Sequence, residues 1–283
     1  MDDAGGVAGV GIPAPAVRWP VIPWVEAVFF IIFLSVPALG PGYLTDFASR
    51  LLILALFLIV TAIQPVHAGP LEDGLAAYKK GDFDTAVRLL KPLAEEGNAQ
   101  AEEKLGRMYQ RGKGLPKNFE RAVEWYRKAA EKGDPAAQGR LGFLYRVGAG
   151  VPRDLKLAME WYRKAADQGN PLAQVGLGYM LMDGSGEKPD IEGAAAWFSK
   201  AADQGDALAM LALGTLYELG RGVAKDWVQA HKWYALASVD DGEYEQDLFD
   251  RAKRAKEELA KQMTPAQIAE AERLARAKMP PGK

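Results

Sequence analysis

A pattern that returns every 36 residues constrains the fold of this chain more than any other feature of its sequence. A Leu-Gly pair occurs four times at that interval, a Trp followed by Tyr or Phe occurs four times at the same interval, and no insertion interrupts the series. Periods of this length are typical of arrays in which each copy is one supersecondary unit. The Leu-Gly pairs begin at Leu105, Leu141, Leu177 and Leu213, and the tryptophans are Trp125, Trp161, Trp197 and Trp233.

Each copy has the apolar spacing of two helices. Ala101, Leu105 and Tyr109 are four residues apart, as on one face of a helix, and the stretch around each Trp has the same kind of periodicity. A Gly-x-Gly segment separates the two stretches, and another Gly follows the second, where positive φ favours glycine. We therefore expect an all-α solenoid of helix-turn-helix units. The expected N-caps are Asn98, Asp134, Asn170 and Asp206 for the first helix and Asn118, Asp154, Asp190 and Asp226 for the second.

The aromatic pair of each copy is expected to hold neighbouring copies together. Isolated helices of about 13 residues are marginal in water, so tertiary packing must stabilise them. We predict that the tryptophans are buried and that Trp161→Ala is severely destabilising. Truncating a buried aromatic side chain costs roughly 3–5 kcal/mol, against a total stability of roughly 5–15 kcal/mol.

Residues 145–169 carry a nearly complete motif, Tyr-x-x-Gly-x-Gly-Val-x-x-Asp followed by Ala-x-x-Trp-Tyr-x-x-Ala-Ala-x-x-Gly. This motif resembles the Sel1-like repeat family, which is related to tetratricopeptide repeats. The resemblance implies a right-handed α-solenoid that acts as an adaptor for protein partners. We expect no cofactors. It divides the chain into four repeats, at 98–133, 134–169, 170–205 and 206–241, after a degenerate tetratricopeptide-like helix pair at 70–97.

The pattern stops after residue 241, and residues 242–283 are expected to form capping helices. Two helices are predicted at about 243–261 and 265–278, the second capped by Thr264 with Pro265 at its first position. A narrow apolar stripe on the first of them suits a solvating end cap, which repeat arrays require. A partner-binding coiled helix is the alternative. The stripe consists of Leu248, Ala252, Ala255 and Leu259.

Residues 1–68 contain two apolar runs, at 21–39 and 51–63, which predict an N-terminal signal or membrane region of one or two hydrophobic helices. The second run has the length of a signal-peptide core, and Val66-x-Ala68 supplies a small-residue cleavage pattern, so cleavage after Ala68 is expected. The mature chain would then be periplasmic or otherwise extracytoplasmic. Two alternatives stay open: a membrane anchor through 21–63, which would give membrane contact, and a translation start near Leu44.

If the repeats stack as in tetratricopeptide arrays, as the resemblance implies, the first helices line a concave groove. The positions five and two before each Leu and two and five after it then face this groove, which changes from polar to apolar along the array. We expect it to bind a peptide or a helix of a protein partner. The alternative is that curvature buries the apolar side chains against neighbouring helices. The candidate groove residues are Arg107, Phe143, Arg146, Leu172, Val175, Tyr179, Met182, Leu211, Thr215 and Glu218.

Composition argues against several other functions. The chain has no cysteine and two histidines, which leaves no thiolate site and almost no histidine chemistry, so we expect no metal and no catalytic residue. A formal charge of −2 gives no basic field for nucleic acid. The recurring Gly-x-Gly lies between helices rather than after a strand, so it is a turn and not a phosphate loop. His231 is expected at the surface or at an interface.

The alternative to a protein-binding adaptor is a cell-wall-associated enzyme or penicillin-interacting protein of the same repeat family.

Overall fold

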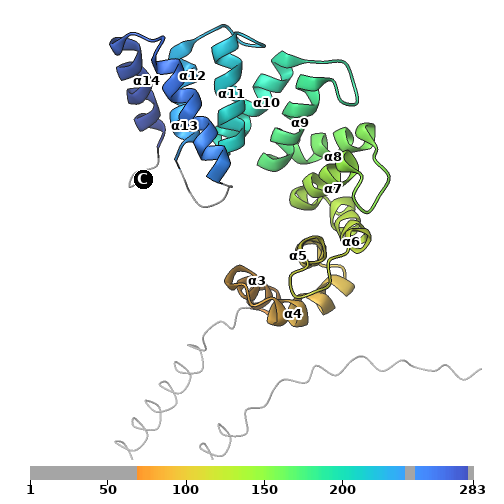
Figure 1. The fold of residues 1–283 in the computed structure, drawn as a ribbon. Helices are drawn as coiled ribbons and strands as arrows, with labels where there is room; N and C mark the ends of the chain where they lie inside the picture. The colour runs from red at the N-terminus through yellow and green to blue at the C-terminus, as the bar shows by residue number, and fades with distance from the viewer. Residues whose placement is uncertain (1–68, 240–245, 280–283) are drawn as a thin grey trace, which may run out of the picture. The chain divides into compact units, whose positions relative to one another are not determined.

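The computed structural model describes residues 69–239 and 246–279, which lie in one compact unit, Ala68–Lys283. This part of the chain contains twelve helices and no strand (Figure 1). The all-α solenoid predicted from the 36-residue period is therefore confirmed. The apolar runs at 21–39 and 51–63, the cleavage site after Ala68 and the start near Leu44 lie outside the described residues.

Eight helices form the four predicted repeats, and four flank them. Each repeat consists of a first helix, termed the A helix, and a second helix, termed the B helix. The A helices are α5 (Ala99–Arg111), α7 (Pro135–Val147), α9 (Pro171–Asp183) and α11 (Ala207–Leu219). The B helices are α6 (Phe119–Glu131), α8 (Leu155–Asp167), α10 (Ile191–Asp203) and α12 (Trp227–Ala237). The flanking helices are α3 (Pro70–Lys80), α4 (Phe83–Glu95), α13 (Gln246–Ala260) and α14 (Pro265–Lys278).

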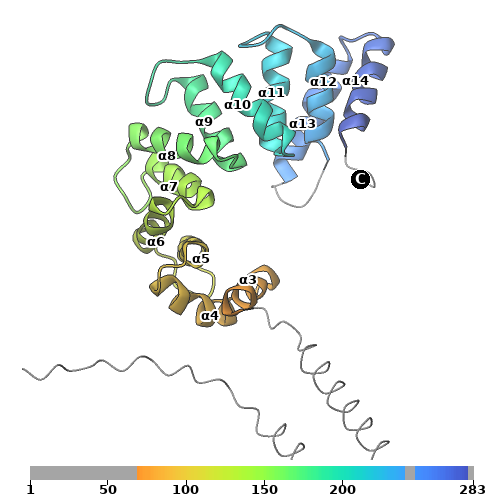
Figure 2. The ribbon, with the colours of Figure 1, turned by 180° about the vertical axis from the view of Figure 1, so that it is seen from behind.

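Consecutive helices from α3 to α12 pack against one another, and the contacts are most extensive within each A–B pair. The same succession of pairs is visible from both sides (Figures 1 and 2). All eight predicted N-caps accept a hydrogen bond from a backbone N–H of the first helical turn. The Gly-x-Gly turn also forms as expected: Gly112 and Gly114 have φ angles of 68° and 70°.

The aromatic pair is buried in a different way from the prediction. The second residue of the pair is enclosed, because its ring lies on the glycine of the Leu-Gly pair; a Cβ on Gly106 would lie 2.7 Å from Cδ1 of Tyr126. The tryptophans of the first three repeats are only half-buried, and a lysine three residues later stacks on each ring, as Lys164 does on Trp161 at 4.4 Å. The prediction of a buried tryptophan layer is wrong for these three. The enclosed rings are Tyr126, Tyr162, Phe198 and Tyr234.

The C-terminal helices cover the last repeat. Both α13 and α14 pack on α12, and they do not pair with each other as A and B helices do. Leu248, Ala252 and Leu259 are buried, which supports the end cap over a free coiled helix. The cap also buries the fourth tryptophan, Trp233, and encloses His231, which is 3% exposed rather than at the surface.

Candidate functional site

The predicted groove residues all lie on the A helices, so we call the surface formed by α5, α7, α9 and α11 the A-helix face. Two of them are not available on this face: Val175 is 6% exposed and Leu211 is 8% exposed. Both belong to the apolar core, so the alternative that stacking buries apolar groove positions holds for these two. The other eight are exposed or half-buried: Arg107, Phe143, Arg146, Leu172, Tyr179, Met182, Thr215 and Glu218.

The enclosed tyrosines reach this face with their hydroxyl groups. Tyr126 donates a hydrogen bond to Oε1 of Gln110 at 2.8 Å, and Tyr234 donates to Oε2 of Glu218 at 2.7 Å. Gln110 and Glu218 occupy the same position of their A helices, five residues after the repeat Leu. The rings of Tyr126 and Tyr234 are therefore each fixed by a polar group that lines the A-helix face.

Burial raises the pKa of these phenols. The pKa of Tyr126 and that of Tyr234 lie well above the ordinary value because the phenolate would lose its hydration. The pKa of Tyr162 is raised for the same reason, although the nearby Arg146 opposes the shift through a hydrogen bond and its charge. These hydroxyl groups are therefore neutral hydrogen-bond donors at physiological pH.

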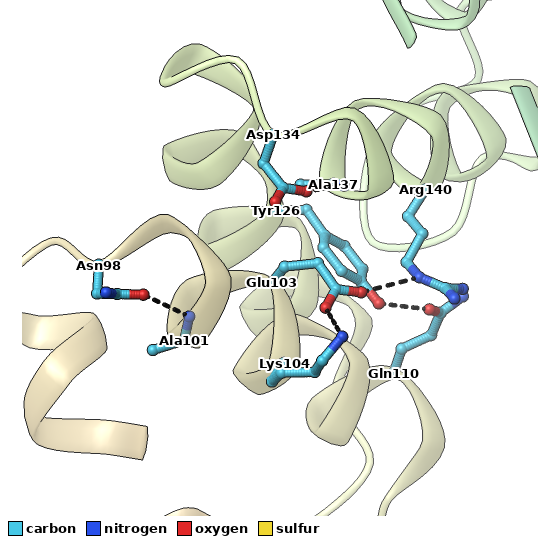
Figure 3. A network of polar contacts seen from close by, with 9 residues as sticks. All are labelled: Asn98, Ala101, Glu103, Lys104, Gln110, Tyr126, Asp134, Ala137 and Arg140. Carbon is cyan, nitrogen blue, oxygen red and sulfur yellow. Dashed lines mark hydrogen bonds and ion pairs between the residues drawn. The ribbon is translucent and has the colours of Figure 1, made fainter. Parts of the chain in front are cut away.

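A second polar network joins the first two repeats through Glu103 of α5 (Figure 3). This carboxylate is nearly fully buried, with its side chain 3% exposed, and it accepts hydrogen bonds from Nζ of Lys104 at 2.6 Å and Nε of Arg140 at 3.3 Å. Asp134, the N-cap of α7, lies close enough to interact with the charges of Glu103 and Lys104. The pKa of Asp134 is raised, mainly because its carboxyl group is partly buried. Lys104 and Arg140 thus share one carboxylate partner within the protein.

Two other arginines on this face have no such partner. Within the described residues, no carboxylate forms an ion pair with Arg107 of α5 or with Arg146 of α7, and the Nε atom of each is buried without a hydrogen-bond partner. Aromatic rings hold the guanidinium groups instead: Arg107 lies 5.9 Å from the ring centre of Tyr78, and Arg146 lies 5.6 Å from that of Phe143.

The third repeat makes the same face apolar. Phe198 replaces the buried tyrosine, Met182 occupies the position that is Gln110 or Glu218 elsewhere, and Tyr179 packs edge-on against Phe198 with ring centres 5.0 Å apart. Leu172 at the start of α9 is 41% exposed. Along the A-helix face, polar and cationic side chains in the first two repeats therefore give way to apolar ones in the third.

A buried polar ladder between repeats was not anticipated. Gln138 donates to the carbonyl of Ala130 at the end of the preceding B helix, and its Oε1 accepts from Gln168 at the end of its own B helix, at 2.7 Å. Glu102 and Lys132 form the equivalent contact in the first repeat, as an ion pair of 2.6 Å. The sequence contains a sign of this ladder, because in each of the first three repeats the two polar partners are 30 residues apart.

Two further features bear on possible sites in residues 69–239 and 246–279. None of the helices there combines the length and the apolar character that a membrane crossing requires. That part of the chain also holds no cluster of three histidine, aspartate or glutamate side chains arranged to bind a metal ion.

Comparison with known proteins gives a family and a fold. The model of the Sel1 repeat family matches residues 69–98, 99–134, 135–170, 171–206 and 207–238, so it includes the first helix pair as a fifth repeat. No curated protein matches the chain.

Solved structures of repeat proteins resemble the chain. A Sel1 repeat protein from Oxalobacter formigenes is 28% identical, with a TM-score of 0.56, and the match covers 74% of this chain and 100% of that one. A protective antigen of uropathogenic Escherichia coli with an SLR fold is 25% identical over 74% of this chain and 68% of its own, with a TM-score of 0.35. A Sel1 repeat protein described from Klebsiella pneumoniae is 18% identical over 66% and 89% of the two chains, with a TM-score of 0.45.

Proposed function

Because the chain belongs to the Sel1 repeat family, whose repeats generally mediate protein–protein interaction, we propose that it is a non-catalytic scaffold that binds a peptide or a helix of a partner protein on its A-helix face. The partner would contact polar side chains in the first two repeats and apolar side chains in the third.

The observation that carries this proposal is the apolar surface of the third repeat, where Leu172 is exposed and Tyr179 and Met182 are half-buried. On the B helices of the first three repeats, the half-buried tryptophans are covered by lysine side chains, with Nζ 3.8–4.4 Å from the ring centres. On the A-helix face, no lysine or arginine of the described residues stacks on Tyr179, and Leu172, two turns earlier in the same helix, is exposed. Apolar side chains that converge on one face and lack an internal cover are typical of the anchors that bind a partner.

A pair of charge-matched variants tests this proposal. Leu172→Glu places a carboxylate on the A-helix face, whereas Ala196→Glu places one on the exposed side of α10 in the same repeat. Neither residue is buried, so both variants should fold, which circular dichroism would check. Partners captured from cells by the tagged chain should be lost with Leu172→Glu and retained with Ala196→Glu. Capture that is equal for the two variants would contradict the proposal.

We further propose that this binding takes place at the cell envelope. The support is sequence-based: the apolar run at 51–63 and the Val66-x-Ala68 pattern suit export followed by cleavage after Ala68. Mass spectrometry of the chain purified from fractionated cells tests the location. A periplasmic chain that begins at Gly69 is the expected result. An uncleaved chain in the membrane fraction would instead support anchoring through 21–63, and a cytoplasmic chain would refute both.

A further inference from the structure

Arg107 and Arg146 stand apart from the other cations on the A-helix face. Lys104 and Arg140 lie on the same two helices, α5 and α7, and share the buried carboxylate of Glu103. Arg107 and Arg146 are half-buried, each has a buried Nε with no hydrogen-bond partner, and neither has a carboxylate partner in the described part of the chain. A guanidinium group that is partly removed from water and has no anion beside it has a higher free energy than one that is paired, so binding of an anion would stabilise it.

The surroundings keep both guanidinium groups in place. The ring of Tyr78 lies beside Arg107, and the ring of Phe143 lies beside Arg146, at 5.9 and 5.6 Å from ring centre to Cζ. Arg146 also interacts with the hydroxyl of Tyr162, which is itself fixed in the core. Such contacts leave the planar donor fork with less freedom to lose when a carboxylate binds.

The charge distribution favours discrete carboxylates over a polyanion. The whole chain has a formal charge of −2, so it offers no general attraction for nucleic acid or for an anionic membrane. Two separate guanidinium groups suit single acidic side chains, and the neutral hydroxyl of Tyr126, bonded to the neutral amide of Gln110, lies near that of Arg107. The apolar third repeat continues the same face, where Tyr179 and Met182 are half-buried.

We propose that Arg107 and Arg146 bind carboxylates of an acidic segment of a partner protein, and that apolar residues adjoining this segment occupy the third repeat. This inference rests on the proposed function and adds the chemistry of the partner to it. Each arginine supplies charge-assisted, bidentate hydrogen bonds to one Asp or Glu side chain.

The inference is tested with the purified full chain and a fluorescein-labelled synthetic peptide that carries four glutamates followed by two leucines and a phenylalanine. A second peptide has glutamine in place of each glutamate. Fluorescence anisotropy should show tighter binding of the acidic peptide, weakening as salt increases. Arg107→Gln and Arg146→Gln should each weaken that binding by roughly tenfold, the size of one charge-assisted hydrogen-bond pair. Arg107→Lys keeps the charge but loses the planar arrangement of donors. Its affinity for the acidic peptide should therefore lie between that of Arg107→Gln and that of the unmodified chain.

Arg121→Gln is the matched control, because it removes the same charge from an exposed arginine on α6 that already pairs with Glu124. It should change binding by less than about twofold, as expected for an exposed ion pair. Thermal melts of all variants separate lost binding from lost folding.

Three results would overturn the inference. They are equal binding of the acidic and glutamine peptides, an Arg121→Gln effect as large as that of Arg107→Gln, and stronger Arg107-dependent binding to phosphatidylglycerol vesicles than to the peptide. If Leu172→Glu still abolishes partner capture in any of these cases, the proposed function stands and only the acidic chemistry of the partner is wrong.

Discussion

Replacing Tyr162 by alanine tests how the repeats are held together. Its side chain is 1% exposed and lies between two A helices: a Cβ on Gly142 would be 3.0 Å from its ring, and a Cβ on Gly176 would be 2.6 Å from its Cζ. The ring therefore bridges the second and third repeats. Trp161 precedes it in α8 but is half-buried, with Lys164 stacked on its outer side.

The magnitude follows from the area that each ring removes from water. A fully enclosed aromatic side chain buries roughly 150–250 Å², which at about 25 cal/mol/Å² contributes about 4–6 kcal/mol before relaxation. Measured truncations of aromatic core residues cost roughly 3–5 kcal/mol. We expect Tyr162→Ala to lower the free energy of unfolding by about 4 kcal/mol. Trp161→Ala should cost about half as much, because less of its area is buried and the lysine stem can move into the space.

Urea denaturation followed by circular dichroism measures both variants against the unmodified chain. Tyr162→Phe serves as a control that removes only the hydroxyl and should cost about 1 kcal/mol, the net value of one hydrogen bond. The third repeat already carries Phe198 at this position. In a repeat array, a broader transition with Tyr162→Ala would show that the two sides of the array have become uncoupled. A larger loss for Trp161→Ala than for Tyr162→Ala would refute the reasoning.

Two further predictions concern buried polar groups. Lys132→Met should lower the free energy of unfolding by about 3 kcal/mol, because it removes the partner of the Glu102 carboxylate, whose side chain is 2% exposed. Glu102→Gln, which removes the buried charge itself, should lower the free energy of unfolding by less than about 1 kcal/mol. Equal losses for the two variants in urea titrations would contradict this reasoning. Burial, together with the charge of Lys256 and despite the opposing Glu272, holds the pKa of His231 below its ordinary 6.5. The unfolded chain therefore binds a proton there more readily, so stability should fall as the pH drops below about 6.5. His231→Gln should weaken that fall, and an unchanged pH dependence would exclude His231 as its source.

Helices, turns and caps were predictable from the sequence because local chemistry decides them. Asp154 accepts its capping hydrogen bond from Leu157, and Gly148 takes a φ of 73°, as residue type and spacing indicate. The family also follows from local motifs, since the motif around residues 145–169 recurs in the matching repeats.

Burial within the array was less predictable, because it depends on how helices tilt against their neighbours. Trp161 and Tyr162 are adjacent in one helix, and periodicity alone does not decide which of them is enclosed. The placement of Val175 in the core rather than on the A-helix face has the same origin, since it depends on the approach of neighbouring helices.

The pairing of each buried ring with a groove residue could have been found by comparing the four copies. Three copies have a tyrosine together with a polar residue at the position five after the repeat Leu, and one has a phenylalanine together with a methionine. That correlated change in the third copy indicates contact between the two positions. The pairs are Tyr126 with Gln110, Tyr162 with Arg146, Phe198 with Met182 and Tyr234 with Glu218.

The most direct test of the central proposal is photo-crosslinking in living cells. A photoreactive amino acid replaces Met182 on the A-helix face or, as the control, Lys156 on the exposed side of α8. Irradiation should attach a discrete protein partner at position 182 and none at position 156. The same crosslinked species at both positions, or a partner attached only at 156, would contradict binding on the A-helix face.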